Sequence, residues 1–299
     1  MENASIILKQ IVIMFIYMSV GYALFHMKLI TKEGSKSLAN LLLYVVLPCV
    51  LVKSFCLERT PERVKWLLIS IAGAAVLLVT AMWISHLVFR KHPVDDFGAA
   101  FSNAGFIGFP LITAVLGEQA VFYAAGFVAL INALQWTYGQ SLMSGDPSMR
   151  SIKAVLKNPL VISVGIGLLV FFCNIPLPPI VTAPMGAFAA LNAPLAMVIL
   201  GVYLAQTDIV SMFTEPRLYL AAAVRLVLIP LVSVCLMKIL LRGYPDIRLA
   251  LLLSACAPIG SNVAVYAQKL GKDYTHAVKI VCLSTFLSVI TMPLLMMII

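Results

Sequence analysis

Ser102-Asn103-Ala104-Gly105-Phe106-Ile107-Gly108-Phe109-Pro110 interrupts one long apolar stretch of the chain, and Ala257-Pro258-Ile259-Gly260-Ser261-Asn262 interrupts another. The two interruptions lie at matching places in the two halves of the 299-residue sequence. Helix-breaking residues free backbone N–H and C=O groups, and hydrocarbon offers those groups no hydrogen bond, so such breaks persist in a membrane only where protein or a water-filled cavity satisfies them. A matched pair of broken helices, one in each half, is typical of the substrate site of a secondary transporter.

The composition is that of an integral membrane protein. Hydrophobic residues make up 62% of the chain and charged residues only 11%, and the mean hydropathy is +1.03. Soluble proteins carry about a quarter charged residues. A helix needs roughly 20 apolar residues to cross a bilayer. The sequence therefore predicts an all-α protein with ten spans, at residues 5–27, 37–56, 65–89, 97–116, 119–143, 159–175, 181–206, 217–240, 247–268 and 274–298. The first stretch is too long for a cleavable signal peptide and lacks a small-residue cleavage site, so we interpret it as the first span.

The basic residues indicate how these spans are oriented. A formal net charge of +9 would suit a nucleic-acid-binding protein, but here the positive charges lie in loops, as membrane topology demands. We therefore expect a lipid bilayer, and no nucleic acid, as a partner. The basic connection Gly145–Asn158 is expected in the cytoplasm, which places both termini on the other side of a plasma or inner membrane.

The chain divides into two halves of five spans each, residues 1–147 and 148–299. Three landmarks recur in both halves: Leu47-Pro48 and Ala193-Pro194, Pro110 and Pro258, Gly117 and Gly271. An odd number of spans per half makes the second half enter the membrane from the opposite face. The sequence therefore predicts two inverted five-helix repeats, in which the fourth and ninth spans are broken helices that meet.

The fourth span carries the first candidate substrate-binding residues. Asn103 and Pro110 lie on one helical face, at i and i+7. Pro110 frees a carbonyl group near Phe106, and Gly105 and Gly108 let the chain unwind and let another backbone approach. A half-helix that restarts here has unpaired N–H groups and a positive dipole end, which favour a carboxylate.

The ninth span repeats this pattern. Pro258 and Gly260 break the helix, while Ser261 and Asn262 add polar side chains. The alternative is a packing kink, since Gly and Pro are common in transmembrane helices. Two interruptions at matched positions favour a binding site over that alternative.

Further polar residues lie inside other spans. Asn132 and Gln135 in the fifth span either contact a ligand or form interhelical hydrogen bonds, and the second role is favoured for Gln135. Arg225 in the eighth span is the deepest basic residue. It pairs with an anionic substrate, binds carbonyl groups freed by a neighbouring broken helix, or extends to the cytoplasmic interface. Lys53 and Lys279 lie nearer span ends and are expected to extend to the interface.

The sequence does not support chemistry on a bound substrate. All twelve Asp and Glu residues lie in loops or at span edges, so no buried carboxylate is expected as a proton carrier or sodium ligand. Asp246 is the nearest candidate for such a role. The six cysteines show no metal-ligand spacing, and no Ser-His-Asp set or phosphate loop is present. We expect no enzyme, no cofactor and no metal centre, with a sodium site near Asn103 and Asn262 as an open alternative.

These motifs together resemble those of the auxin efflux carrier family, which includes plant PIN-type auxin exporters and bacterial carriers of malonate, malate and similar anions. The segment Asn103–Pro110 is similar to the family's fourth-span signature. The resemblance extends over essentially the whole chain, through Leu47-Pro48, Asn132–Thr137, Ala193-Pro194, Leu200-Gly201, Arg225–Pro230 and Thr285–Pro293. More distantly, the chain is similar to bile acid–sodium symporters and to sodium–proton antiporters.

The resemblance implies a scaffold of spans 1, 2, 6 and 7, which forms a homodimer, and a transport domain of spans 3–5 and 8–10. The second would move against the first like an elevator. It also implies that Asn103, Pro110 and Pro258 build the crossover site and that Asn132 supports it. The chain differs from the large plant exporters in its short loop Gly145–Asn158 and in the polar pair Ser261-Asn262. A small organic anion therefore fits better than auxin.

The sequence leaves several functions to be compared. The leading one is a secondary carrier for a small carboxylate, coupled to H⁺ or Na⁺ or to neither. The second is a sodium-coupled symporter in which Asn103, Ser261, Asn262 and freed carbonyl groups bind the cation. A facilitative channel is a third, which an inverted repeat disfavours.

Overall fold

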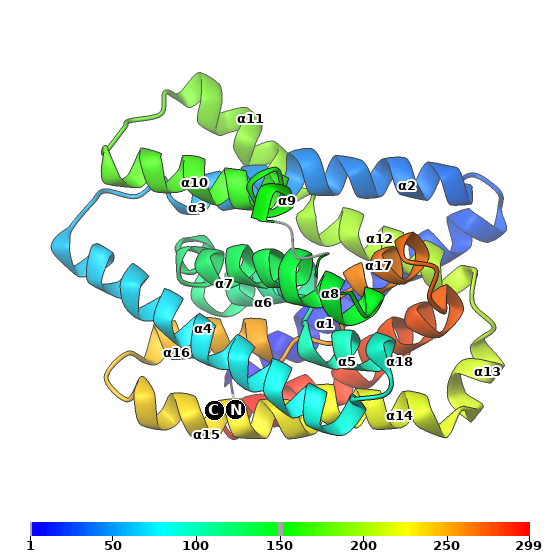
Figure 1. Cartoon of the computed structure of the whole chain (residues 1–299). Helices are drawn as coiled ribbons and strands as arrows, with labels where there is room; N and C mark the ends of the chain where they lie inside the picture. Colours follow the sequence, from blue (N-terminus) through cyan, green and yellow to red (C-terminus); the bar gives the residue numbers. More distant parts are fainter. Residues whose placement is uncertain (1, 147, 149–151) are drawn as a thin grey trace.

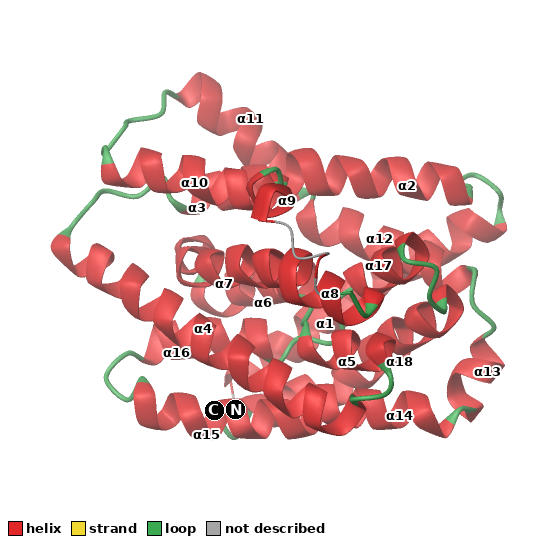
Figure 2. Cartoon of the chain, viewed as in Figure 1, coloured by secondary structure: helices red, strands yellow, loops and turns green. Residues whose placement is uncertain are grey.

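The computed structural model describes residues 2–146, 148 and 152–299. The described residues are mostly helical and form no strand (Figure 2). They contain one isolated antiparallel bridge, between Ser102 and Ile259. Pro147, at the predicted boundary between the halves, and Arg150, in the basic connection, lie outside the described residues.

The helices follow the expected spans in order along the chain. Those of the first half are α1 (Glu2–His26), α2 (Lys32–Leu41), α3 (Leu47–Ser54), α4 (Pro61–Phe89), α5 (Pro93–Ala100), α6 (Phe109–Leu116), α7 (Val121–Leu134) and α8 (Gln140–Ser144). Those of the second half are α9 (Ile152–Leu156), α10 (Pro159–Phe172), α11 (Pro179–Ala190), α12 (Asn192–Ala205), α13 (Ile209–Thr214), α14 (Pro216–Ala223), α15 (Ile229–Leu240), α16 (Pro245–Ala255), α17 (Asn262–Lys269) and α18 (Tyr274–Met296). The π-helical turns η1 (Leu42–Val46), η2 (Ala104–Gly108), η4 (Gln135–Gly139) and η6 (Val224–Leu228) and the 3₁₀ turn η3 (Glu118–Ala120) continue some of them.

Seven helical stretches of the described chain are long and apolar enough to cross a membrane. They are residues 4–26, 32–54, 61–89, 118–144, 179–205, 216–240 and 274–296. The other three expected spans are the fourth and ninth, which are broken in the middle, and the sixth, where α10 has 14 residues. A helix of 14 residues is about 21 Å long, shorter than a hydrocarbon core of about 30 Å. Ten crossings and the inverted arrangement therefore stay predictions.

Proline residues account for the wide turns inside several spans. The π-helical turns η1, η2 and η6 are followed directly by α3, α6 and α15. The second residue of each of these helices is a proline: Pro48, Pro110 and Pro230, respectively. Because proline has no N–H group, a carbonyl group one turn earlier loses its helical partner, and the helix widens locally. Such turns let a span bend without leaving the membrane.

Two glycines bring α1 and α12 into direct backbone contact. A Cβ atom on Gly21 would lie 2.1 Å from the carbonyl oxygen of Val198, and one on Gly201 would lie 1.9 Å from that of Met18. Small residues at membrane helix interfaces permit this close approach. The pair α1–α12 is therefore a rigid element that joins the two halves.

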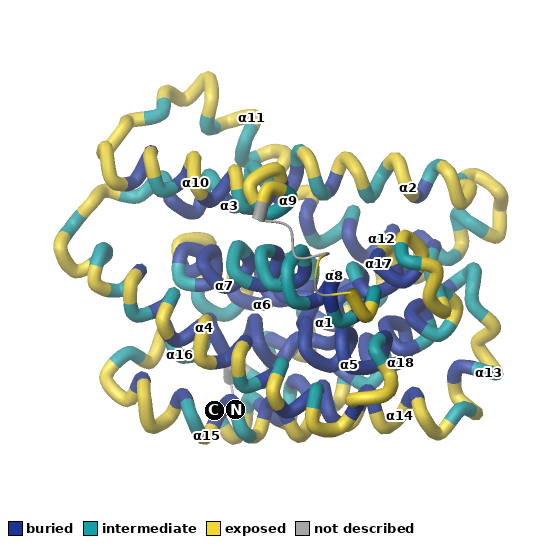
Figure 3. Tube along the Cα trace, viewed as in Figure 1, coloured by how far each residue is buried: buried dark blue, intermediate teal, exposed yellow. Residues whose placement is uncertain are grey.

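The broken spans lie in the interior, and apolar side chains cover the outside. In Figure 1, α2, α3 and α10 follow one edge of the molecule and α14 and α15 the opposite edge, with the broken spans between them. The outer helices expose large apolar side chains, such as Trp83, Ile180 and Ile239, whereas the central helices are buried (Figure 3). An exposed apolar surface of this extent is the surface that a bilayer covers.

Candidate functional site

The two predicted breaks meet in space. In the fourth span α5 ends at Ala100 and helix resumes at Ala104, and in the ninth α16 ends at Ala255 and helix resumes at Asn262. The extended segments between them pair as an antiparallel bridge. The Asn103 N–H donates to the Pro258 carbonyl over 2.8 Å, and the Gly260 N–H donates to the Phe101 carbonyl over 3.0 Å. Each break thus satisfies part of the backbone of the other. We call this paired region, residues 101–103 and 256–261, the crossing.

Gly260 allows this close pairing. A Cβ atom at this position would lie 3.1 Å from the Ser102 carbonyl oxygen and 3.2 Å from that of Phe101. Gly108 has a similar role on the other side of the crossing, where a Cβ atom would lie 3.3 Å from the Cα atom of Ser254 in α16. Two of the three predicted site glycines, Gly108 and Gly260, therefore serve the approach of the two breaks, whereas a Cβ atom on Gly105 would meet only the side chain of Leu47.

Arg225 satisfies carbonyl groups that remain free at the crossing. Its side chain is 1% exposed. Its Nε donates to the Ala257 carbonyl over 3.1 Å, and its Nη1 donates to the Ala99 carbonyl over 3.0 Å. Of the three roles that the sequence left open, these hydrogen bonds fit the binding of freed carbonyl groups, and a contact with the substrate stays a prediction. Arg225 holds both broken spans, and its guanidinium does not extend to the interface.

A small cavity of about 40 Å³ lies at the crossing. Seven of the predicted site residues line it: Asn103, Gly105, Asn132, Gln135, Gly260, Ser261 and Asn262. No acidic residue is among its lining residues. A cavity of this size holds a few water molecules, so a larger ligand requires the surrounding helices to separate.

The crossing leaves hydrogen-bonding groups available. The Nδ2 atom of Asn103 and the Oγ atom of Ser102 are buried without a protein partner, and both residues line the small cavity. No side chain caps the start of η2 or of α17. Unpaired N–H groups at a helix start attract negative charge. Ser102 was part of the quoted motif, but sequence reasoning did not single it out.

The predicted amides of the fifth span are engaged in two different ways. The Asn262 Nδ2 donates to Gln135 Oε1 over 2.8 Å, so Gln135 makes the interhelical hydrogen bond that was favoured for it. The Asn132 Nδ2 donates to the Val128 carbonyl of its own helix over 2.8 Å. Asn132 borders the small cavity with its side chain 6% exposed.

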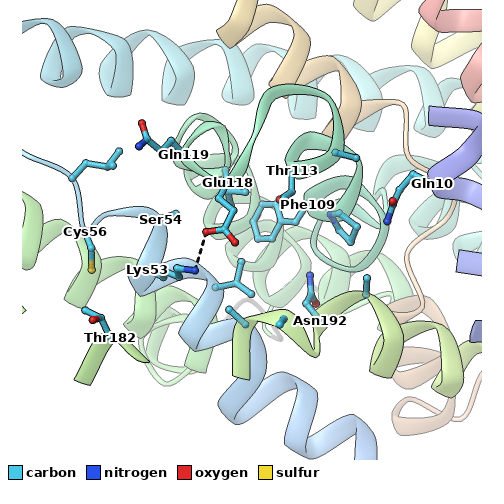
Figure 4. A pocket seen from close by; sticks show the side chains of 18 residues that line it. Gln10, Lys53, Ser54, Cys56, Phe109, Thr113, Glu118, Gln119, Thr182 and Asn192 are labelled. Atoms are coloured by element: carbon cyan, nitrogen blue, oxygen red, sulfur yellow. Dashed lines mark hydrogen bonds and ion pairs between the residues drawn. The ribbon is translucent and has the colours of Figure 1, made fainter. Parts of the chain in front are cut away.

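A second, larger cavity of about 520 Å³ lies toward the ends of α3 and α6. Pro110, the remaining predicted residue of the fourth span, lines this cavity and not the small one. Figure 4 shows Lys53 of α3 reaching across it to Glu118 of η3, with 2.8 Å between Nζ and Oε2. Lys53 therefore pairs with an exposed carboxylate, and its expected extension to the membrane interface stays a prediction.

Asn192 is a functional candidate that sequence reasoning missed. It lines the larger cavity, and its Nδ2 donates over 3.0 Å to the carbonyl of Gly105, which lines the small one. Its Oδ1 is buried without a partner. Asn192 therefore lies between the two cavities and links α12 to η2. Its position just before the Ala193-Pro194 motif was the available signal.

The expectation that no carboxylate is buried was wrong. Asp95 and Asp96, at the start of α5, are both 0% exposed. They lie at a span edge, as the sequence indicated, but α4, α14 and α18 fold over that edge and bury them. Asp246, which the sequence indicated only as the nearest candidate, is exposed. Lys279 pairs with Glu215, and its expected extension to the membrane interface stays a prediction.

Known proteins similar to the chain are membrane transporters. A family described as "Membrane transport protein" matches residues 6–154, and the "Sodium Bile acid symporter family" matches residues 190–299. A protein of Rhizobium meliloti (strain 1021) named "Putative malonate transporter" is 26% identical over 280 residues. That alignment covers 87% of this chain and 85% of the Rhizobium protein.

Proposed function

The chain belongs to the auxin efflux carrier family of membrane transport proteins, and from this premise we propose that it is a secondary transporter of a small organic anion. It is a multi-pass membrane protein. We further propose that it lies in the plasma or inner membrane with both termini outside the cytoplasm, because the basic connection Gly145–Asn158 is expected inside.

The crossing of the two broken spans is the observation that carries this proposal. Two uncapped helix starts and the unpaired Nδ2 of Asn103 border a cavity that has no acidic lining residue. Helix N-termini and amide donors suit a carboxylate group. In this proposal Asn103 donates to the carboxylate, Ser261 and the η2 start add donors, and Arg225 holds the crossing in shape.

The substrate class is proposed from the site and from the relative. The small cavity is lined by hydrogen-bond donors such as Asn103 and Ser261, and no Lys or Arg is among its lining residues. We propose that these donors bind a small anion with one or two carboxylates. The name of the Rhizobium protein contains malonate, so malonate is the first substrate to test. An auxin-like acid is the second.

We propose an elevator-like mechanism for its movement. The helices α4–α8 and α14–α18 would move together against α1–α3 and α10–α12, and the second group would form a homodimer. The larger cavity supports this, because its volume of about 520 Å³ lies in the usual range of ligand sites, about 300–1,000 Å³. It lies between the two groups and is separated from the crossing by Asn192.

A sodium-coupled symporter is the second candidate. The match of residues 190–299 to the sodium–bile acid symporter family favours ion coupling. In that version the Oδ1 atoms of Asn103 and Asn262, Ser261 and nearby carbonyl groups would bind Na⁺ at the crossing.

Uptake by purified protein in liposomes tests the proposal. We expect radiolabelled malonate to accumulate in protein-containing vesicles and not in empty ones, and excess unlabelled malonate to compete. Indole-3-acetate and acetate are the comparison substrates. Dependence on a sodium gradient would favour the second candidate. Absence of uptake of every acid would reject the transport of small carboxylates, and unitary currents in planar bilayers would indicate a channel instead.

A further inference from the structure

Two adjacent aspartates at the start of α5 have opposite surroundings. Both carboxylate oxygens of Asp95 have partners: Oδ1 lies 2.6 Å from His276 Nε2, and Oδ2 accepts from Arg217 Nε over 2.7 Å. Asp95 therefore has a permanent cationic partner and fastens α5 to α14 and α18. A buried carboxylate with such partners remains ionised.

One of the two carboxylate oxygens of Asp96 has no hydrogen-bond partner. Its Oδ2 lies 2.8 Å from His86 Nδ1 in α4, and its Oδ1 is buried with no hydrogen-bond partner. The side chain is 0% exposed, whereas that of His86 is 45% exposed. Burial of an ionised carboxylate with one oxygen unsatisfied is costly. A proton bound to Asp96 or to His86 removes that cost, because it gives either a neutral carboxyl group or an ion pair.

The other charged groups around α5 have partners other than Asp96. Arg217 and His276 bind Asp95, Lys279 pairs with Glu215, and Arg225 binds backbone carbonyl groups. From α17, Tyr266 packs on Phe97 of α5, and Lys269 lies over the ring of Trp136. The segment α8 has no titratable residue, and Arg90 and Lys91 are exposed beyond the end of α4. If no proton is added, the carboxylates of Asp95 and Asp96 carry two negative charges, and Arg217 compensates only one of them.

We propose that Asp96 and His86 form a site that binds one proton, and that this proton is a coupling ion of the transporter. The two residues lie ahead of the apolar stretch 97–116. Burial raises the pKa of Asp96 above its ordinary value, although hydrogen bonds from His86 and Ser85 oppose this. Burial alone would also raise the pKa of Asp95, but His276 and Arg217 outweigh it and lower that pKa.

The site lies between the end of α4 and the crossing. His86 is half-exposed in the last turn of α4, and in this proposal it provides the path for the proton. The other end of α5 is held at the crossing, where Arg225 binds the Ala99 carbonyl and Gly260 binds that of Phe101. Asp96 lies about one helical turn before the end of α5 at Ala100, and Asn103 follows three residues later in the extended segment. In the proposed function both sites belong to the same moving group of helices, so proton and anion would move together.

Spectroscopy of the purified protein tests the proton site without any substrate. Over a pH titration, we expect one step in either the infrared carbonyl stretch of a protonated carboxyl group or the ¹⁵N signal of a histidine ring. Asp96→Asn and His86→Gln should each remove that step. Asp246→Asn is the matched control, because Asp246 is exposed near the start of α16, the first half of the other broken span. It should leave the step unchanged. A step that persists in folded Asp96→Asn protein, or the lack of any step in the wild type, would overturn the site.

Transport tests the coupling, which rests on the proposed function. An inward proton gradient should accelerate malonate uptake into wild-type vesicles, and this acceleration should be lost in Asp96→Asn. Malonate uptake that ignores the gradient in the wild type would refute the coupling and leave transport standing. A titration step with no uptake of any acid would instead refute the transport of those acids and leave the proton site standing.

Discussion

The amide of Asn103 is buried at the crossing, yet its Nδ2 donates to no protein group. Its backbone already stabilises the fold, because the N–H pairs with Pro258 and the carbonyl accepts from Ile107. A side chain with no structural partner is available for a ligand. Its removal should therefore affect function more than stability.

We predict that Asn103→Ala abolishes malonate uptake in proteoliposomes while the protein remains folded. The backbone hydrogen bonds of the crossing do not involve this side chain, so thermal unfolding in detergent should change by no more than a surface substitution would, about 0.5 kcal/mol. Asn40→Ala, at an exposed position of α2, is the control and should retain uptake. Normal uptake by Asn103→Ala would exclude Asn103 from the site.

Arg225 should show the opposite behaviour. We predict that Arg225→Met lowers the thermal stability, because the buried Ala257 and Ala99 carbonyl groups lose their donor. Each unsatisfied buried group costs about 1–3 kcal/mol. Arg225→Lys should be intermediate, since one ammonium group cannot reproduce the geometry of Nε and Nη1 together. Melting curves in detergent measure both variants, and an Arg225→Met protein as stable as the wild type would contradict the role assigned to Arg225.

At single positions, the sequence indicated which residues are polar inside a span but not what they contact. Arg225 was recognised as the deepest basic residue, whereas its partners Ala99 and Ala257 lie far away along the chain. The burial of Asp95 was missed because its partners, Arg217 and His276, come from the second half. Contacts across such separations leave no periodic pattern in the sequence.

At the scale of elements, the breaks themselves were predictable. Pro110 and Pro258 remove backbone donors, and Gly108 and Gly260 permit a close approach, so local chemistry decides where the helices stop. The pairing of Ser102 with Ile259 was expected only as a meeting of the two breaks. Its register depends on α5 and α16 being held by Arg225, which a local pattern cannot reveal.

The packing of α1 on α12 gives a prediction about helix contacts. Gly201→Ala should destabilise the protein by about 3 kcal/mol or more, because its Cβ would lie 1.9 Å from the Met18 carbonyl oxygen and 2.8 Å from the Tyr22 nitrogen. Backbone atoms cannot move aside without separating the helices. Thermal unfolding in detergent measures the effect.

Gly165→Ala in α10 is the matched control, because no atom lies within 4 Å of a Cβ atom there. Alanine should stabilise this helix by up to about 0.5–1 kcal/mol. If the unfolding temperature of Gly201→Ala equals that of Gly165→Ala, α1 and α12 are not in close contact in the protein.

At the scale of the whole molecule, few polar side-chain contacts join the two proposed groups of helices. Asn192 binds the Gly105 carbonyl, and Lys53 pairs with Glu118. The pair is exposed, and an exposed ion pair contributes about 0–1 kcal/mol, so it can break in each transport cycle. Within the proposed moving group, by contrast, Asp95 and Arg225 bind several helices together.

A covalent link between the groups should therefore stop transport. In a background without native cysteines, we predict that Lys53→Cys and Glu118→Cys joined by a short bifunctional thiol reagent lose malonate uptake. Cleavage of a reducible linker should restore it. The reason is that α3 and η3, which the pair joins in this structure, belong to the two groups that must move apart.

The control places the same link inside one group. Glu215 and Lys279 also form an ion pair, but α14 and α18 both belong to the proposed moving group. Glu215→Cys and Lys279→Cys joined by the same reagent should keep most of the uptake. Transport that continues with the Lys53–Glu118 link in place would show that these helices do not move relative to each other. Loss of uptake with both links would show instead that the reagent, and not the blocked movement, inactivates the protein.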